Sequence, residues 1–112
     1  MKLGMAIFEQ KTTSFEATTI SDIMRTFRGK NMVVQYFVDG YFIDLYFPKY
    51  KLAIECDERR HTFGHNAEND RIRQSRIQSS LGFVCAFVRY APYAKDFSIF
   101  DVINEINCHI NP

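Results

Sequence analysis

The sequence predicts one α/β domain, in which a mixed central sheet is flanked by helices. Apolar residues recur with the period of a helix in residues 16–27, in residues 66–81 and after Ser98. Four apolar runs of strand length separate these helices, which gives the order α-β-β-β-α-β-α. Residues 52–88 read as strand, helix and strand, and a crossover of this kind makes its two strands parallel neighbours. A chain of 112 residues suits a single domain.

The first helix is predicted over residues 16–27. Thr13 and Glu16 have the spacing of a capping box at its start, and Gly29 suits a C-cap. The residues before Thr13 fit no element, so we expect an irregular segment over 1–13 and the domain over 14–112. The apolar stripe of the helix consists of Ala17, Ile20, Ile23, Met24 and Phe27.

Two strands are predicted next, over residues 32–37 and 42–47. Asp39-Gly40 between them is a typical tight hairpin turn. A turn at 48–50 leads to a third strand over 52–56, which is almost entirely apolar and therefore suits the centre of a sheet.

A polar loop is expected over 57–65, followed by the second helix over 66–81, with Gly82 as its C-cap. The apolar stripe of this helix is thin, which favours a surface position. A fourth strand is predicted over 83–88, and Ser98 is expected to cap the last helix. The stripe of the second helix is Ala67, Ile72, Ile77 and Leu81, and that of the last helix is Ile99, Val102, Ile103 and Ile106.

The bulk composition excludes some classes of protein. Hydrophobic residues make up 46% and charged residues 24% of the chain, as in ordinary globular proteins, and no apolar run is long enough to span a membrane. Three cysteines are an odd number, which argues against a disulfide scaffold and favours a reducing intracellular compartment, the cytoplasm or nucleus. The net charge of +1 neither requires nor excludes nucleic acid. Basic residues nevertheless cluster after the third strand, where they favour a phosphate-binding face: Arg59, Arg60, Arg71, Arg73 and Arg76.

Three carboxylates stand out from their apolar surroundings. Asp44 interrupts the second strand, Glu55 lies near the end of the third, and Asp57 follows two residues later. Residues i and i+2 of an extended chain project to the same side, so Glu55 and Asp57 are expected to point together, with Asp44 alongside. Converging carboxylates repel one another unless protons or a cation neutralise them. Oxygen ligands of this kind suit Mg²⁺ or Mn²⁺.

Simpler interpretations stay open for each of these residues. Asp44 can be a strand-edge carboxylate in water, Asp57 a turn cap, and Glu16 the partner of Thr13 in the capping box. His61 can be a solvated loop residue. A zinc site of Cys56, His61 and His65 matches no common ligand spacing. The arginines of the second helix can form a solvated face, in which Asp70 and Arg73 pair at the surface.

The order and spacing of these residues match a known family. The matching elements are Glu16, Gln35, Ile43-Asp44-Leu45, Leu52-Ala53-Ile54-Glu55-Cys56-Asp57, His61, Asp70 with Arg73, Gly82, and Val88-Arg89-Tyr90. This pattern resembles the PD-(D/E)XK nuclease superfamily, and within it the very-short-patch-repair (Vsr)-like endonucleases, over roughly residues 14–107. It also looks like a nuclease-like domain at the C-terminal end of some large-DNA-virus proteins.

The resemblance implies a restriction-endonuclease-like fold and Mg²⁺- or Mn²⁺-dependent hydrolysis of DNA. It implies that Asp44 and Glu55 hold the metal, with Asp57 beside them where many superfamily members have a lysine. It assigns His61 an acid/base or ligand role, and Glu16 the orientation of water or metal. Positive charge at the phosphate would come from Arg73 or Arg89. The expected nucleic-acid contacts are Arg59, Arg60, Arg73, Arg76 and Gln35.

Two other classes of function stay open. One is an inactive nuclease fold that binds nucleic acid or a protein partner, and the other is a purely structural domain of a longer protein. A degenerate nuclease typically lacks an acidic ligand, whereas this chain has all three, which favours activity. Sequence-specific cutting would need a homodimer or a separate recognition domain, fused or not.

Overall fold

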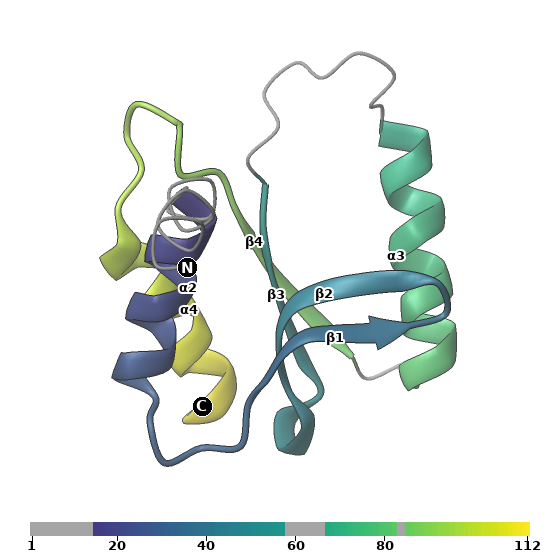
Figure 1. Cartoon of the computed structure of the whole chain (residues 1–112), viewed down its shortest axis with the longest axis horizontal. Helices are drawn as coiled ribbons and strands as arrows, with labels where there is room; N and C mark the ends of the chain where they lie inside the picture. The colour runs from purple at the N-terminus through teal and green to yellow at the C-terminus, as the bar shows by residue number, and fades with distance from the viewer. Residues whose placement is uncertain (1–14, 58–66, 83–84) are drawn as a thin grey trace, which may run out of the picture.

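The computed structural model describes residues 15–57, 67–82 and 85–112. Within them the elements follow the predicted order (Figure 1). The predicted capping residue Thr13 and the irregular segment 1–13 lie outside the described residues. The elements are α2 (Phe15–Thr26), β1 (Val33–Val38), β2 (Tyr41–Phe47), the 3-10 turn η1 (Pro48–Tyr50), β3 (Leu52–Cys56), α3 (Ala67–Leu81), β4 (Ala86–Tyr90) and α4 (Ile99–Ile110).

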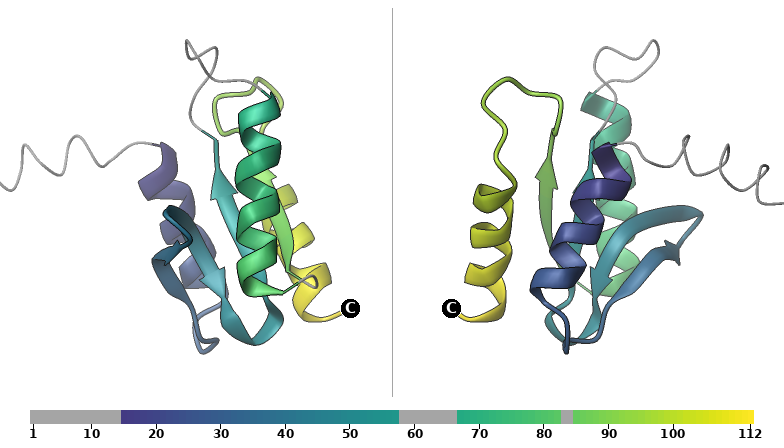
Figure 2. Two further views of the ribbon diagram at one scale, coloured as in Figure 1. Left: turned by 90° about the vertical axis from the view of Figure 1, so that its right-hand side faces the viewer. Right: turned by 60° about the vertical axis from the view of Figure 1, so that its left-hand side comes forward.

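The four strands form one mixed sheet in the order β1-β2-β3-β4. The β1–β2 and β2–β3 pairs are antiparallel, and β3 and β4 are parallel, as the predicted crossover requires. Helices α2 and α4 cover one face of the sheet and α3 covers the other (Figure 2). The mixed sheet between helices is therefore confirmed.

The tight hairpin between β1 and β2 is also confirmed. Asp39 and Gly40 both have positive φ, 49° and 84°. Positive φ at both central residues is typical of a type I′ turn, whose twist matches that of the strands it joins.

The fourth strand differs from its prediction over 83–88. In the structure β4 spans Ala86–Tyr90, because each of its residues pairs with one of β3, from Leu52 with Ala86 to Cys56 with Tyr90. Residues 83 and 84 lie outside the described residues. Pairing with the neighbouring strand, and not the apolar run alone, therefore sets the end of β4 and includes Arg89 in the sheet.

The core has one apolar cluster on each side of the sheet. The larger lies between the sheet and helices α2 and α4, and includes Ile23, Phe47 and Ile106. The smaller lies under α3, where Ile77 packs against Ile43. Ile72 of the predicted α3 stripe is 43% exposed. All three cysteines are free, and none of the described helices is long and apolar enough to cross a membrane.

A buried hydrogen bond joins α2 to β4. The hydroxyl oxygens of Thr19 and Tyr90 lie 2.6 Å apart, and both residues are buried. The hydroxyl of Thr19 also donates to the Phe15 carbonyl (2.7 Å), so the Tyr90 hydroxyl donates to Thr19. Burial raises the pKa of Tyr90 above its ordinary value, which keeps this donor protonated.

We expect Tyr90→Phe to lower the free energy of unfolding by about 1 kcal/mol, the typical net contribution of a hydrogen bond. Urea unfolding of the two proteins measures the difference. Tyr36→Phe is the matched control, because the Tyr36 hydroxyl forms no hydrogen bond within the described part of the chain. Equal losses in the two variants would show that the Thr19–Tyr90 bond adds nothing to stability.

Candidate active site

The candidate site lies where β2 separates from β3. Their ladder extends from Phe47 with Leu52 to Leu45 with Ile54 and then stops. Asp44 is the next residue of β2 and Glu55 the next residue of β3 beyond the last pair. The two carboxylates of the predicted site lie near enough for the charge of Asp44 to raise the pKa of Glu55.

The separation of the strands leaves a backbone donor of β3 without a strand partner. The Asp57 N–H donates to the Tyr90 carbonyl of β4 (2.8 Å), so the preceding N–H, that of Cys56, points toward β2. The Asp44 carboxylate accepts a hydrogen bond from this Cys56 N–H through Oδ2, at 2.8 Å. An unpaired buried N–H is costly, so Asp44 has a structural role here as well as a candidate functional one.

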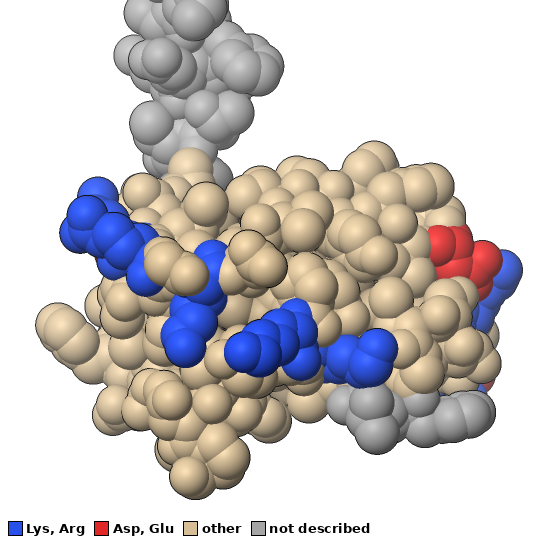
Figure 3. All heavy atoms as spheres, turned by 90° about the horizontal axis from the view of Figure 1, so that it is seen from below, with Lys and Arg blue, Asp and Glu red and all other residues tan. Residues whose placement is uncertain are grey.

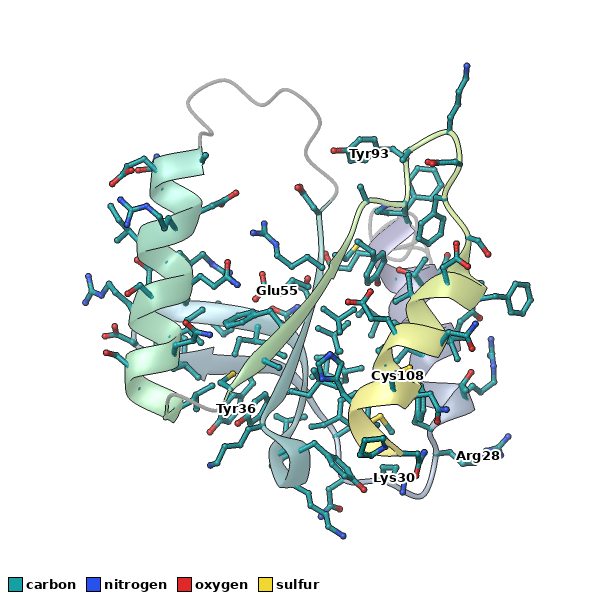
Figure 4. The ribbon with its side chains drawn as sticks, turned by 180° about the vertical axis from the view of Figure 1, so that it is seen from behind. Arg28, Lys30, Tyr36, Glu55, Tyr93 and Cys108 are labelled. Carbon is teal, nitrogen blue, oxygen red and sulfur yellow. The ribbon has the colours of Figure 1, made fainter. Side chains whose placement is uncertain are left out.

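Glu55 is the buried acid of the site, with 7% of its surface exposed. Its two carboxylate oxygens accept hydrogen bonds from Arg73 of α3, at 2.7 and 3.0 Å. Burial raises the pKa of Glu55, and the nearby charge of Asp44 raises it further, while Arg73 and Arg89 act in the opposite direction. Figure 4 shows Glu55 on the side of the sheet that faces α3.

Arg73 is held by three residues of β2 and β3. Besides Glu55, its guanidinium donates to the Phe42 carbonyl of β2 (2.8 Å) and lies over the ring of Tyr41, 5.5 Å from the centroid. The predicted surface pair of Asp70 with Arg73 is therefore wrong. Asp70 instead forms an ion pair with Arg89 of β4 (3.5 Å). A bidentate bond to a carboxylate that is largely removed from water is stronger than a pair at the helix surface, which explains the preference of Arg73.

Gln35 joins Asp44 to the first helix. Its neighbours Val34 and Tyr36 pair with Leu45 and Ile43, which places Gln35 opposite Asp44. Its amide nitrogen lies 3.4 Å from Asp44 Oδ1 and 3.4 Å from Glu16 Oε2 of α2, both at the long end of hydrogen-bonding distance. Gln35 has a φ of 52°, a left-handed conformation that non-glycine residues rarely adopt. Backbone strain of this kind is typical of functional sites.

The third predicted carboxylate does not complete a metal-binding group. No three His, Cys, Asp or Glu side chains in residues 15–57, 67–82 and 85–112 form a group that could hold a metal ion. Asp44, Glu55 and Asp57 therefore do not form such a group in the described residues, and their joint role as metal ligands stays a prediction. The Glu55 carboxylate is bound by Arg73 of α3, and Asp57 is the first residue after β3.

Of the remaining predicted site residues, the structure describes Arg76 but not His61, Arg59 or Arg60. Arg76 pairs with Asp39 at the hairpin turn, at 2.9 Å, and is exposed. The structure thus brings Glu16, Gln35, Asp44, Glu55 and Arg73 together.

Two contacts of the site were absent from the sequence-based prediction. One is the bidentate bond between Arg73 and Glu55, and the other is the Asp70–Arg89 pair. The sequence singled out Arg73 and Arg89 as candidate positive charges at the phosphate, but nothing in it named Glu55 and Asp70 as their respective partners.

No family model, curated protein or solved structure matches this chain. The resemblance to PD-(D/E)XK nucleases stays a prediction that rests on the motifs.

The donor set of the site fits a hard divalent cation. Mg²⁺ is commonly held by one or two protein carboxylates, with waters and substrate phosphates completing its shell, and Asp44 and Glu55 supply two carboxylates. Within the part of the chain that the structure describes, Oδ1 of Asp44 has only the long contact to Gln35, whereas each oxygen of Glu55 accepts a hydrogen bond from Arg73. Metal binding through the lone pairs that Arg73 uses would require Arg73 to release Glu55, whereas each oxygen of Glu55 keeps a second lone pair.

Proposed function

We propose that this chain is a metal-dependent endonuclease that hydrolyses DNA phosphodiester bonds. The observation that carries the proposal is the proximity of the Asp44 and Glu55 carboxylates at the point where β2 and β3 separate. The motif resemblance supports it independently, because it picks the same two residues. The free thiols of all three cysteines suit our proposal of a reducing intracellular compartment.

In this proposal Asp44 and Glu55 would hold Mg²⁺ or Mn²⁺, which would lower the pKa of a bound water and neutralise charge on the phosphate. Arg73, once released from Glu55, lies beside the site and can pair with a phosphate oxygen through two N–H groups. Glu16 and Gln35 keep Asp44 in place from the side of α2. His61 as acid/base group, Asp57 as a further ligand, and Arg59, Arg60 and Arg76 as DNA contacts stay predictions.

A second candidate function is supported by one specific observation. Arg73 already neutralises Glu55 with a bidentate bond, so the charge of this acid is balanced without a metal. An inactive nuclease fold that binds nucleic acid or a protein partner would have such an arrangement. In this second proposal the same surface binds DNA and never cuts it.

The experiment that separates the two candidates is a cleavage assay on labelled duplex, single-stranded and mismatched DNA with Mg²⁺, Mn²⁺ or EDTA. We expect cutting with either metal and none with EDTA. Binding without cutting under every condition would favour the inactive module. If cutting needs a homodimer, it should appear only at high protein concentration. If it needs a separate recognition domain, it should appear only when that partner is added.

A further inference from the structure

A row of basic side chains crosses the underside of the molecule, away from the candidate site. Figure 3 shows this face, where lysines and arginines gather and acidic residues lie only at its far edge. We define this basic row as Arg28, Lys30, Lys49 and Lys51, all of them exposed. No motif or charge cluster singled out from the sequence contains these residues.

Two connections that are distant in the sequence build the basic row. Arg28 and Lys30 lie in the link between α2 and β1, and Figure 4 shows both at the lower end of α2. Lys49 belongs to η1, and Lys51 follows it immediately before β3. Tyr50 joins the two halves, because Lys30 Nζ lies 3.4 Å from its hydroxyl and the ammonium groups of Lys30 and Lys49 each lie 5.8 Å from its ring centroid.

The positive charge of the basic row is not balanced by neighbouring acids. Within residues 15–57, 67–82 and 85–112, none of these four cations forms an ion pair, whereas Arg25, Arg71, Arg73, Arg76 and Arg89 each do. Like charges held together repel one another at a cost in stability. A polyanion that binds across the row would remove that cost.

The surroundings of the row favour nucleic acid over an acidic protein. Protein interfaces have an apolar core, whereas interfaces with nucleic acid are more polar and strongly positive. The large exposed apolar side chains of the described chain lie in α2, the β1–β2 hairpin, α3 and α4, and none lies in residues 28–31 or 48–51. Tyr50 is half-buried between its two lysines and is not a free apolar anchor.

We propose that the basic row is a second binding surface for the phosphate backbone of nucleic acid, separate from the candidate active site. Lys51 precedes β3 and Glu55 lies near its other end, four residues and about 13 Å further on. This inference rests on the proposed function for the identity of the polyanion. The row would hold a flanking part of the same DNA, without reading its sequence.

The test measures DNA binding in EDTA, so that no cleavage is needed. Fluorescence anisotropy with a labelled duplex and a labelled single strand is recorded over a range of KCl concentrations. Lys30→Ala/Lys49→Ala is compared with Arg25→Ala/Lys95→Ala, which also removes two exposed positive charges but lies outside the row. We expect the first variant to bind roughly tenfold more weakly and to reduce the slope of log K against log salt by about 2, since each lost phosphate contact reduces it by about 1.

Two results would overturn this assignment. One is an affinity and a salt slope for Lys30→Ala/Lys49→Ala equal to those of the control on both DNA forms. The other is equal competition by a polyglutamate peptide of matched charge, which would make the occupant an acidic polypeptide. Equal thermal unfolding midpoints of the two variants verify that folding is unaffected. If Lys30→Ala/Lys49→Ala binds DNA more weakly but the unchanged protein never cuts DNA, the basic row is supported and the nuclease proposal is rejected. If the unchanged protein cuts DNA and the variant binds it as well as the control does, the nuclease proposal is supported and the basic row is rejected.

Discussion

Replacing Arg73 with alanine is expected to lower the free energy of unfolding by about 3 kcal/mol at pH 7, because it leaves the buried Glu55 without its cation. The side chains of Arg73 and Glu55 are only 24% and 10% exposed, so water compensates little of that loss. For a domain of this size the loss corresponds to a fall of roughly 10 °C or more in the unfolding midpoint. Thermal and urea unfolding measure it.

Arg76→Ala is the matched control for this prediction. Arg76 lies on the same helix and also forms an ion pair, with Asp39, but its side chain is 56% exposed. Exposed ion pairs contribute little to stability, so we expect a small effect there. Equal stability of the two variants at pH 7 would mean that Arg73 is not needed to hold the charge of Glu55.

The effect of Arg73→Ala should depend on pH in a defined direction. The pKa of Glu55 is already raised in the folded protein, and loss of Arg73 removes the largest influence that lowers it. For an acid with a raised folded-state pKa, stability is fully present below the unfolded-state pKa and is lost as pH rises through the folded-state pKa. The difference in the free energy of unfolding between Arg73→Ala and the unchanged protein should therefore shrink as the pH falls toward about 4. A difference that stays constant from pH 7 to pH 4 would contradict this account.

Asp44→Asn and Glu55→Gln are each expected to reduce metal-dependent DNA cleavage by about a thousandfold, if the chain is the proposed nuclease. A metal ion stabilises the transition state by several kcal/mol, and each loss of about 1.4 kcal/mol of that stabilisation slows the reaction tenfold. Asp44→Asn keeps an oxygen that can accept the hydrogen bond from the Cys56 N–H, so the fold should survive. Initial rates with saturating Mg²⁺ measure the effect.

Asp101→Asn is the control for these two variants, because Asp101 is an exposed carboxylate of α4 on the other side of the sheet. We expect its cleavage rate to be unchanged. Cleavage by Asp44→Asn and Glu55→Gln at more than a tenth of the normal rate would remove both carboxylates from the chemistry. The nuclease proposal would then lose the observation that carries it.

Local patterns in the sequence predicted most of the secondary structure. The third strand, over 52–56, has the bounds of β3, since Leu52–Cys56 is apolar except for Glu55 and a turn precedes it. The Asp39-Gly40 turn was equally predictable, because few residue types adopt positive φ readily and both Asp and Gly are among them. The bounds of β4 were not predictable, because they depend on which residues of β3 stand opposite.

The same division holds for the candidate site. Local patterns were enough to show which carboxylates interrupt apolar strands, and the antiparallel pairing of β2 with β3 then brings Asp44 near Glu55. The folded arrangement was needed to show that Arg73 neutralises Glu55, that Arg89 pairs with Asp70, and that Gln35 adopts a left-handed conformation beside Asp44. The difference lies in how far apart in the sequence the interacting residues are. Apolar periodicity and turn preference depend on near neighbours in the chain. The partner of a buried charge depends instead on which side chains the packed helices and strands bring within a few ångströms.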